Sequence, residues 1–379
     1  MFDDIRPFND SETRAILTET LNDPALAKTI GAWVAPGLNK KLPWLVQPLI
    51  RQVLKLYFMR VRTINAFQMK LAPFVARLLK KSVAEFTVHG LEKLSRDKPY
   101  LFVSNHRDIV MDPAMVNWAL HQNGFQTVRI AIGDNLLTEP FSSNLMRLNK
   151  SFIVKRSVKG LKAKLKAAQE LSRYIHFSIR EEAANIWIAQ REGRAKDGYD
   201  RTNSAVIGMF SLSKPKTVDY SDYINELNIV PVAISYELDP LDVAKARELH
   251  AQHTKGEYKK RRNEDMTSIA RGMTGWKGRV HLEVGGVLNG DFQSDDDVAA
   301  AIDEQVHRIY KPFETNEWAE AQLLNKPFDV SNDNVATLKK RVDSARGELK
   351  PYILRQYANG MKMRRGEEAY AATSMQVEE

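Results

Sequence analysis

The segment from Tyr100 to Ala114, YLFVSNHRDIVMDPA, places a histidine among carboxylates directly after an apolar run. His106 is followed by Asp108 and Asp112. A histidine beside a carboxylate can take a proton from an alcohol, while the carboxylate holds the ring in one tautomer and stabilises the imidazolium that forms. The sequence therefore predicts that His106 is a general base, and either Asp108 or Asp112 is its partner.

The elements that position this histidine follow from the pattern of apolar residues. Short apolar runs alternate with helical stretches from Pro99 onward, which is typical of an α/β fold with a mostly parallel central sheet flanked by helices. Strands are predicted at residues 100–105, 127–133, 151–156, 185–190, 229–237 and 279–288, and helices at 113–122, 158–182 and 240–254. Ligands bind at the carboxyl ends of strands in such sheets, where His106 is expected to lie.

We expect the chain to divide into a helical region at 1–85, an α/β domain at 86–315 and a helical C-terminal extension at 316–379. The run DDDVAAAIDEQVHRIYKPF begins with acids suited to a helix N-terminus and predicts one further helix. Another helix is predicted at about 334–357, packed on the outside, and the tail from Arg364 onward is expected to be frayed.

The first region has an unusual charge pattern. Between Asp23 and Glu85 there is no carboxylate, but there are eleven Lys or Arg residues. Apolar residues recur three or four apart in 42–84, which predicts two or more helices, and no window of eighteen residues is free of charge. A cationic amphipathic face with aromatic residues suits a helix that rests on an anionic membrane. The alternative is a helical hairpin whose cations are simply solvated.

Composition limits the remaining classes of function. The 379 residues carry a net charge of +9, which favours an anionic partner, and the absence of cysteine excludes disulfides, thiolate metal sites and a cysteine nucleophile. The N-terminus is acidic and polar, so we expect no export signal. The motifs of nucleotide-fold cofactors and of metal sites are missing, so no cofactor and no metal are expected. The basic run at 258–265 suits a solvated loop or the phosphates of coenzyme A better than nucleic acid, because it lacks interleaved aromatic residues.

Three further blocks follow the histidine, at 132–157, 186–202 and 229–237. Their joint order and spacing over about residues 86–290 resemble the glycerophosphate acyltransferase superfamily, which includes glycerol-3-phosphate and 1-acylglycerol-3-phosphate O-acyltransferases. In that superfamily four residues separate the histidine from its aspartate, whereas here five separate His106 from Asp112. Pro113 matches the ending of the family motif and favours Asp112. The third block keeps Glu192, Gly193 and Arg194, but no residue separates the last two.

This resemblance implies direct transfer of a fatty acyl group from acyl-CoA or acyl-carrier protein to a hydroxyl of 1-acylglycerol-3-phosphate or glycerol-3-phosphate, in phospholipid synthesis and without an acyl-enzyme. Arg156 and Arg194 are the first choices for binding the acceptor phosphate. The full set assigned to substrate binding is Arg107, Gly133, Asn135, Lys155, Arg156, Arg191, Glu192, Gly193 and Arg194. The expected location is the cytoplasmic face of a membrane. The rival interpretation is a non-catalytic protein that binds anionic lipid on the same fold.

Overall fold

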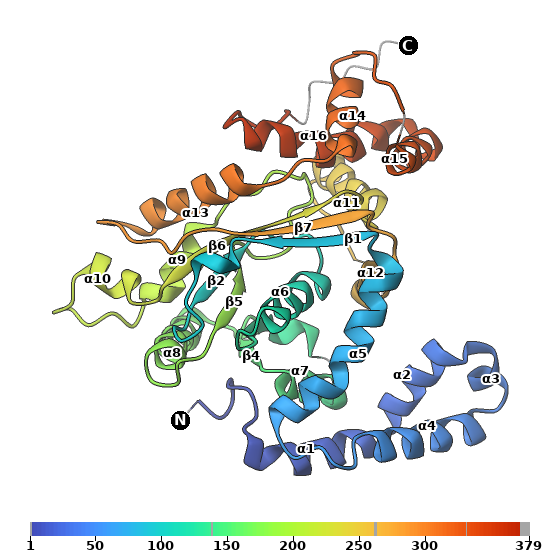
Figure 1. Ribbon diagram of the computed structural model, residues 1–379, viewed down its shortest axis with the longest axis vertical. Helices are drawn as coiled ribbons and strands as arrows, with labels where there is room; N and C mark the ends of the chain where they lie inside the picture. The colour runs from blue at the N-terminus through green and yellow to red at the C-terminus, as the bar shows by residue number, and fades with distance from the viewer. Residues whose placement is uncertain (1, 138, 261–263, 331, 372–379) are drawn as a thin grey trace. The chain divides into compact units, whose positions relative to one another are not determined.

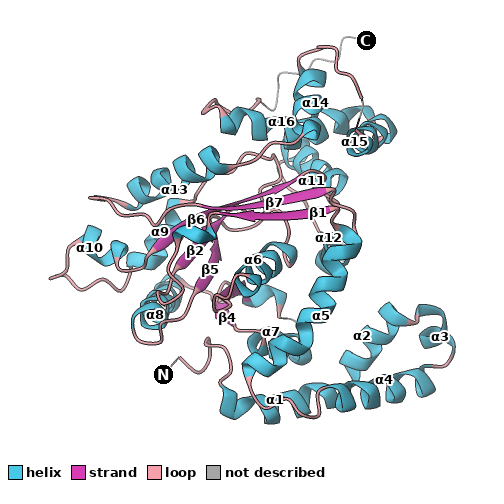
Figure 2. Ribbon diagram, viewed as in Figure 1, coloured by secondary structure: helices cyan, strands magenta, loops and turns pink. Residues whose placement is uncertain are grey.

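The computed structural model describes residues 2–137, 139–260, 264–330 and 332–371, and within them seven strands form one sheet. The strands are β1 (Glu85–His89), β2 (Leu101–Ser104), β3 (Arg129–Gly133), β4 (Ser151–Val154), β5 (Ile186–Ala189), β6 (Ile229–Tyr236) and β7 (Arg279–Val284). Their order is β1-β7-β6-β2-β5-β3-β4. Figure 2 draws the strands in magenta. The pairs β1–β7, β2–β6 and β3–β4 are parallel, and β6–β7 is antiparallel. The predicted α/β fold with a mostly parallel sheet is confirmed.

All six strands predicted from apolar runs are present, but β1 was missed. The sequence of β1, EFTVH, is only partly buried, and the strand lies at one end of the strand order. An edge strand needs fewer apolar residues than a central one, so its pattern is weak. In contrast, all eight residues of β6 are buried, as its continuous apolar run requires of a strand covered on both faces.

The chain forms two compact units, of which the first comprises residues 1–75 and 128–186. Its helices are α1 (Asp10–Asn22), α2 (Pro24–Val34), α3 (Pro36–Lys41), α4 (Pro43–Tyr57), the first part of α5 (Ile64–Ser82), α7 (Pro140–Leu148) and α8 (Leu161–Arg180). Proline fits the first turn of α2, α3 and α4 because the N–H it lacks has no helical partner there. Leu17, Phe58, Phe67 and Leu148 belong to one apolar core of this unit. The helices predicted within 42–84 are confirmed.

The second unit comprises residues 76–127 and 187–379. It contains α6 (Met111–Gln122), α9 (Ser204–Ser211), α10 (Tyr220–Asn225), α11 (Asp242–Lys255), α12 (Glu264–Thr274) and α13 (Asp295–Ile309). Helix α13 packs on β6, and α6 lies on the other side of the β6–β7 pair (Figure 1). Flanking helices therefore cover both faces of this part of the sheet. Part of the basic run at 258–265, residues 261–263, lies outside the described residues.

The C-terminal helices are α14 (Glu314–Leu323), α15 (Asp333–Ser344) and α16 (Lys350–Arg364). The single helix predicted at 334–357 is wrong, because α15 ends at Ser344 and α16 begins six residues later. Gly347 weakens a continuous helix, and Pro351 is suited to a first turn. External packing is also wrong for α16, which buries nine of its residues. Residues 372–379 of the predicted frayed tail lie outside the described part of the chain.

None of the helices within the described residues is long and apolar enough to cross a membrane.

Candidate active site

The buried strand β2 carries the chain to His106, and an amide fixes the end of that strand. Asn105 follows β2 and is fully buried. Its side chain donates to the carbonyl oxygen of Ile234 at 3.0 Å and accepts from the backbone N–H of the same residue at 2.8 Å. These two bonds tie the end of β2 to β6, so the turn that bears His106 begins from a fixed point.

His106 is hydrogen-bonded to Asp112, the partner that the motif ending favoured. Its Nδ1 lies 2.9 Å from Oδ2 of Asp112, and the rings of His106 and Trp187 form a T-shaped contact at a centroid distance of 5.8 Å. Because the carboxylate accepts the Nδ1 proton, Nε2 of the neutral ring carries the lone pair. Among the described residues Nε2 has no hydrogen-bond partner, so it is the atom that can accept a proton from a substrate.

Four donors converge on the buried carboxylate of Asp112. In addition to His106, the backbone N–H groups of Arg107 and Asp108 donate to Oδ2 at 2.6 and 2.9 Å. The hydroxyl of Tyr236 donates to Oδ1 at 2.7 Å. Burial, and then the charge of Asp112, raise the pKa of Tyr236 well above its usual value, so this hydroxyl keeps its proton. The carboxylate is therefore held as an acceptor in one orientation.

Asp108, the alternative partner of His106, is hydrogen-bonded to the backbone and not to the histidine. Its Oδ1 accepts from the backbone N–H groups of Val110 and Met111 at 3.0 and 2.9 Å, where α6 begins. Burial, and then the charge of Asp112, raise the pKa of Asp108. Helix α12 approaches this side chain so closely that a Cβ on Gly272 would lie 1.8 Å from Oδ2. Asp108 thus holds the turn that leads into α6, and the extra residue before Asp112 is accommodated in this turn.

Arg107 points into the protein, where it is paired with Asp200. Its guanidinium donates to Oδ2 of Asp200 at 2.7 Å and to the carbonyl oxygen of Gly198 at 3.3 Å, and both side chains are buried. The backbone carbonyl of Arg107 accepts from Nζ of Lys245 at 2.9 Å, and Lys245 also pairs with Asp239. Burial lowers the pKa of Lys245. These contacts brace the turn that carries His106.

The third block forms a loop after β5. Gly193 has a φ of +73°, which favours glycine, and a Cβ there would meet no atom within 4 Å. The N–H of Ala195 donates to the carbonyl oxygen of His106 at 2.9 Å, so the loop passes beside the histidine. One terminal nitrogen of Arg194 is buried and has no hydrogen-bond partner among the described residues. Arg191 is partly exposed and Glu192 is exposed.

Gln190 was not predicted from the sequence. It follows β5, its backbone N–H donates to the carbonyl oxygen of Ser104 at 2.8 Å, and its side chain is fully buried. Both polar atoms of that side chain lack partners within the described residues. A buried amide without partners is costly, so Gln190 is a candidate to bind a substrate group.

The residues of the second block, and the cations that follow it, belong to the first unit. Gly133 ends β3, and a Cβ on it would lie 3.2 Å from the side chain of Arg156. Asn135 and Arg156 are exposed. The ammonium of Lys155 is paired with Asp4 and with Glu170, the latter at 2.9 Å. The structure thus places Gly133 beside Arg156 and pairs Lys155 with carboxylates.

One group of possible metal ligands occurs in the described residues, on β1 and β7. The ligand atoms of His89, His281 and Glu283 lie within 4.8 Å of one another. His281 is already hydrogen-bonded at both nitrogens, to Glu283 at 2.9 Å and to the hydroxyl of Thr87 at 2.6 Å. Protein groups satisfy this ring, and the geometry around His106 does not use it.

A family model and a solved structure are similar to this chain over part of its length. No match was found among curated protein sequences. The crystal structure of the 1-acyl-sn-glycerophosphate (LPA) acyltransferase PlsC from Thermotoga maritima is similar with 14% sequence identity and a TM-score of 0.37, covering 84% of this chain and 100% of that chain. Residues 85–235 match the sequence model of the acyltransferase family, and this segment contains His106, Asp112 and the third block. This match agrees with the acyltransferase resemblance that the motifs predicted.

Proposed function

We propose that this acyltransferase moves a fatty acyl group from a thioester, acyl-CoA or acyl-carrier protein, to a hydroxyl of a glycerophosphate-type acceptor in phospholipid synthesis. The acceptor is 1-acylglycerol-3-phosphate or glycerol-3-phosphate. The observation that carries the proposal is the pairing of His106 with Asp112 at 2.9 Å, with Nε2 of the ring left open.

In the proposed reaction, Nε2 of His106 takes the proton of the acceptor hydroxyl as its oxygen attacks the thioester carbonyl carbon. The tetrahedral intermediate collapses, the C–S bond breaks, and the imidazolium returns the proton to the leaving thiolate. Asp112 stabilises the imidazolium between these steps. The products are an ester and a free thiol, and no covalent bond to the protein forms.

Arg194 is proposed to bind the phosphate of the acceptor. A guanidinium can hold a phosphate through two parallel hydrogen bonds, and one terminal nitrogen of Arg194 has no partner among the described residues. Arg156 is the second proposed phosphate ligand. Arg107 is proposed as a positioning residue and not as a phosphate ligand, because its ion pair with Asp200 fixes the turn beside His106.

The first unit is proposed to dock on the cytoplasmic face of an anionic membrane. Helix α4 buries none of its residues, and Trp44 on it is 72% exposed. Further large apolar side chains exposed on α2, α3 and α4 are Trp33, Val34, Leu38, Leu45, Leu49, Val53 and Leu56. Exposed apolar surface of this kind marks an interaction site, and the neighbouring cations favour an anionic lipid layer.

The test is release of free thiol from palmitoyl-CoA by the purified protein in the presence of anionic vesicles. We expect release that depends on glycerol-3-phosphate or 1-acylglycerol-3-phosphate. The variant His106→Ala should lower the turnover number about 100- to 10,000-fold, the usual contribution of a general base.

His121→Ala is the matched control, because His121 lies at the other end of α6 and is not part of the site. It should retain the activity of the unmodified protein. If neither acceptor supports release, and acyl-carrier-protein donors also fail, the chain is a lipid-binding protein on an acyltransferase fold and the proposal is wrong.

A further inference from the structure

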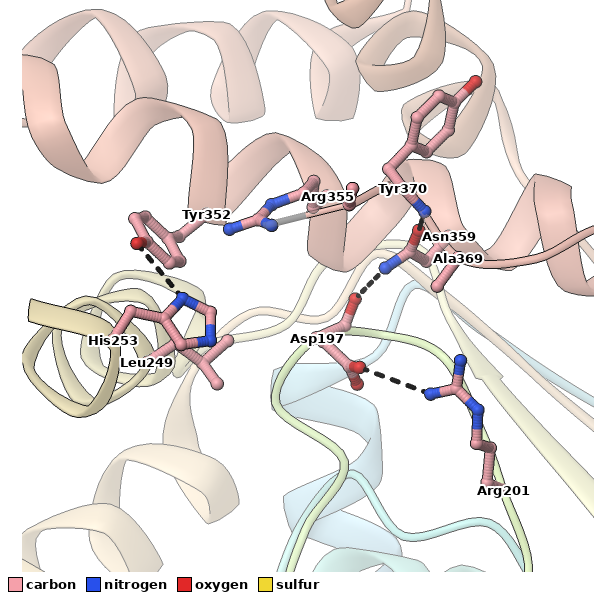
Figure 3. A pocket seen from close by; sticks show the side chains of 10 residues that line it. Asp197, Arg201, Leu249, His253, Tyr352, Arg355, Asn359, Ala369 and Tyr370 are labelled. Carbon is pink, nitrogen blue, oxygen red and sulfur yellow. Dashed lines mark hydrogen bonds and ion pairs between the residues drawn. The ribbon is translucent and has the colours of Figure 1, made fainter. Parts of the chain in front are cut away.

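A cavity lies in the second unit among the loop 197–201, α11 and α16. None of the residues assigned to acyl transfer lines it. Its volume is about 270 Å³, and Asp197, Arg201, His253, Tyr352 and Arg355 are among its lining residues (Figure 3). Ligand pockets usually exceed about 300 Å³, so this cavity suits a small molecule.

Two arginines reach the cavity from different elements, Arg355 from α16 and Arg201 from the loop (Figure 3). Arg355 is only 6% exposed, and no carboxylate within the described residues forms an ion pair with it. Its guanidinium carbon lies 4.5 Å from the centre of the Tyr352 ring. Buried arginines are rarely left without an anionic partner, and here Asp197, a lining residue of the same cavity, attracts the guanidinium of Arg355 without forming an ion pair with it.

The other polar groups of the cavity supply further hydrogen-bond donors and one negative charge, the carboxylate of Asp197. NH1 of Arg201 lies 3.9 Å from Oδ2 of Asp197, beyond hydrogen-bond distance. Nδ1 of His253 lies 3.2 Å from the hydroxyl of Tyr352, while its Nε2 has no hydrogen bond to any described residue. Two guanidiniums therefore face one carboxylate, which leaves the cavity with net positive charge.

We propose that this cavity binds a small phosphomonoester, with Arg355 and Arg201 as the phosphate ligands. A phosphomonoester carries a charge close to −2 at neutral pH and offers oxygens that match two guanidinium forks. Leu249 and Ala369 provide apolar wall for the few carbons of such a ligand. The site goes beyond the acyl transfer proposed above, since it uses neither His106 nor Arg194.

The cavity is mechanically connected to the turn that carries His106. The amide of Asn359 on α16 donates to the carbonyl oxygen of Asp197 at 2.8 Å. The next residue, Gly198, packs so closely on α16 that a Cβ there would lie 1.9 Å from the carbonyl oxygen of Gln356. The carbonyl of Gly198 in turn accepts from Arg107. A ligand that links Arg201 to Arg355 would hold α16 and this loop together.

The test is isothermal titration of the full-length protein with inorganic phosphate and, separately, with glycerol-3-phosphate. We expect a Kd of about 1 mM or below for at least one probe. Arg355→Gln and Arg201→Gln should each weaken this binding about tenfold or more, since each removes charge-assisted hydrogen bonds. Tighter binding of glycerol-3-phosphate assigns the site to phosphomonoesters, and equal binding assigns it to the free phosphate group.

Arg346→Gln is the matched control, because Arg346 is exposed shortly before α16 and does not line the cavity. It should bind both probes as the unmodified protein does. Arg201→Gln keeps the test decisive if Arg355→Gln does not fold, since the Arg201 side chain is 53% exposed. Unchanged binding in Arg201→Gln, or no binding by the unmodified protein, overturns the proposal. Glycerol-3-phosphate is also a proposed acceptor at the His106 site, so the binding that Arg201→Gln and Arg355→Gln remove, and not the total binding, is assigned to this cavity. These readouts do not depend on thioester turnover, so failure here is distinct from failure of the acyl-transfer proposal.

Discussion

Helices α4 and α16 have the same length, 15 residues, but opposite relations to the protein interior. Helix α16 buries nine residues and contributes Ile353, Tyr357 and Ala358 to an apolar core. Helix α4 buries none, although Leu45, Leu49, Val53 and Leu56 give it a strongly apolar face. An amphipathic pattern thus shows that a face avoids water, but it does not show which environment covers that face.

This difference can be tested first by stability. Ile353→Ala on α16 should lower the free energy of unfolding by about 2–5 kcal/mol, because it opens a cavity in a packed core. Leu49→Ala on α4 should change it by less than about 0.5 kcal/mol, as exposed positions do. Denaturant titration of both variants measures the two effects. Equal losses of unfolding free energy in the two variants would mean that α4 packs on protein in solution. The contrast between α4 and α16 would then not exist.

The second test concerns the membrane. The double variant Leu49→Ser, Leu56→Ser should weaken binding to anionic vesicles about 100-fold, since each fully buried leucine contributes about 1.5–3 kcal/mol and a fraction of that is lost per site. Cosedimentation with vesicles measures the change. Leu161→Ser is the control, because Leu161 is 86% exposed but lies on α8. If the control loses as much affinity as the double variant, α4 is not the docking surface.

The third test compares a buried lysine with an exposed one. Burial lowers the pKa of Lys277 to about 8 from its usual 10.5. Between these two pKa values Lys277 keeps its proton in the unfolded chain but has released it in the folded chain. The free energy of unfolding therefore rises with pH, by up to about 1.4 kcal/mol per pH unit. Below pH 8 both states are protonated and the contribution is constant.

Lys277→Met should therefore reduce the gain in unfolding free energy between pH 8 and pH 10, as measured by denaturant titration at both values. Lys55→Met on α4 should leave that gain unchanged, because Lys55 is exposed. A pH dependence identical in the two variants would show that Lys277 is solvated in the folded protein.

Local patterns were sufficient to predict most of the fold. Six strands and the helices of 42–84 follow from the spacing of apolar residues, whereas β1 is too polar to stand out. The break between α15 and α16 was missed because the flanking segments share a helical pattern, and only Gly347 and Pro351 mark the interruption. Weak local signals were thus the source of these two errors.

The site was predictable from the sequence only where its residues lie close together along the chain. His106 and Asp112 lie six residues apart, and one motif contains both. Tyr236 and Lys245 brace the same turn from 124 and 138 residues away in the sequence, so no local pattern connects them to it. The choice between Asp108 and Asp112 depended on the conformation of one turn, which the spacing left open.

The most direct test of the central claim compares Asp112→Asn with Asp108→Asn in acceptor-dependent thiol release from palmitoyl-CoA. Asp112→Asn should lower the turnover number about 100- to 10,000-fold, because an amide no longer fixes the tautomer of His106 or stabilises its cation. Asp108→Asn should stay within a few fold of the unmodified protein, since the amide oxygen of asparagine can accept the same two backbone N–H bonds. Equal activity of the two variants, or a greater loss in Asp108→Asn, would contradict the assignment of His106 and Asp112 as the catalytic pair.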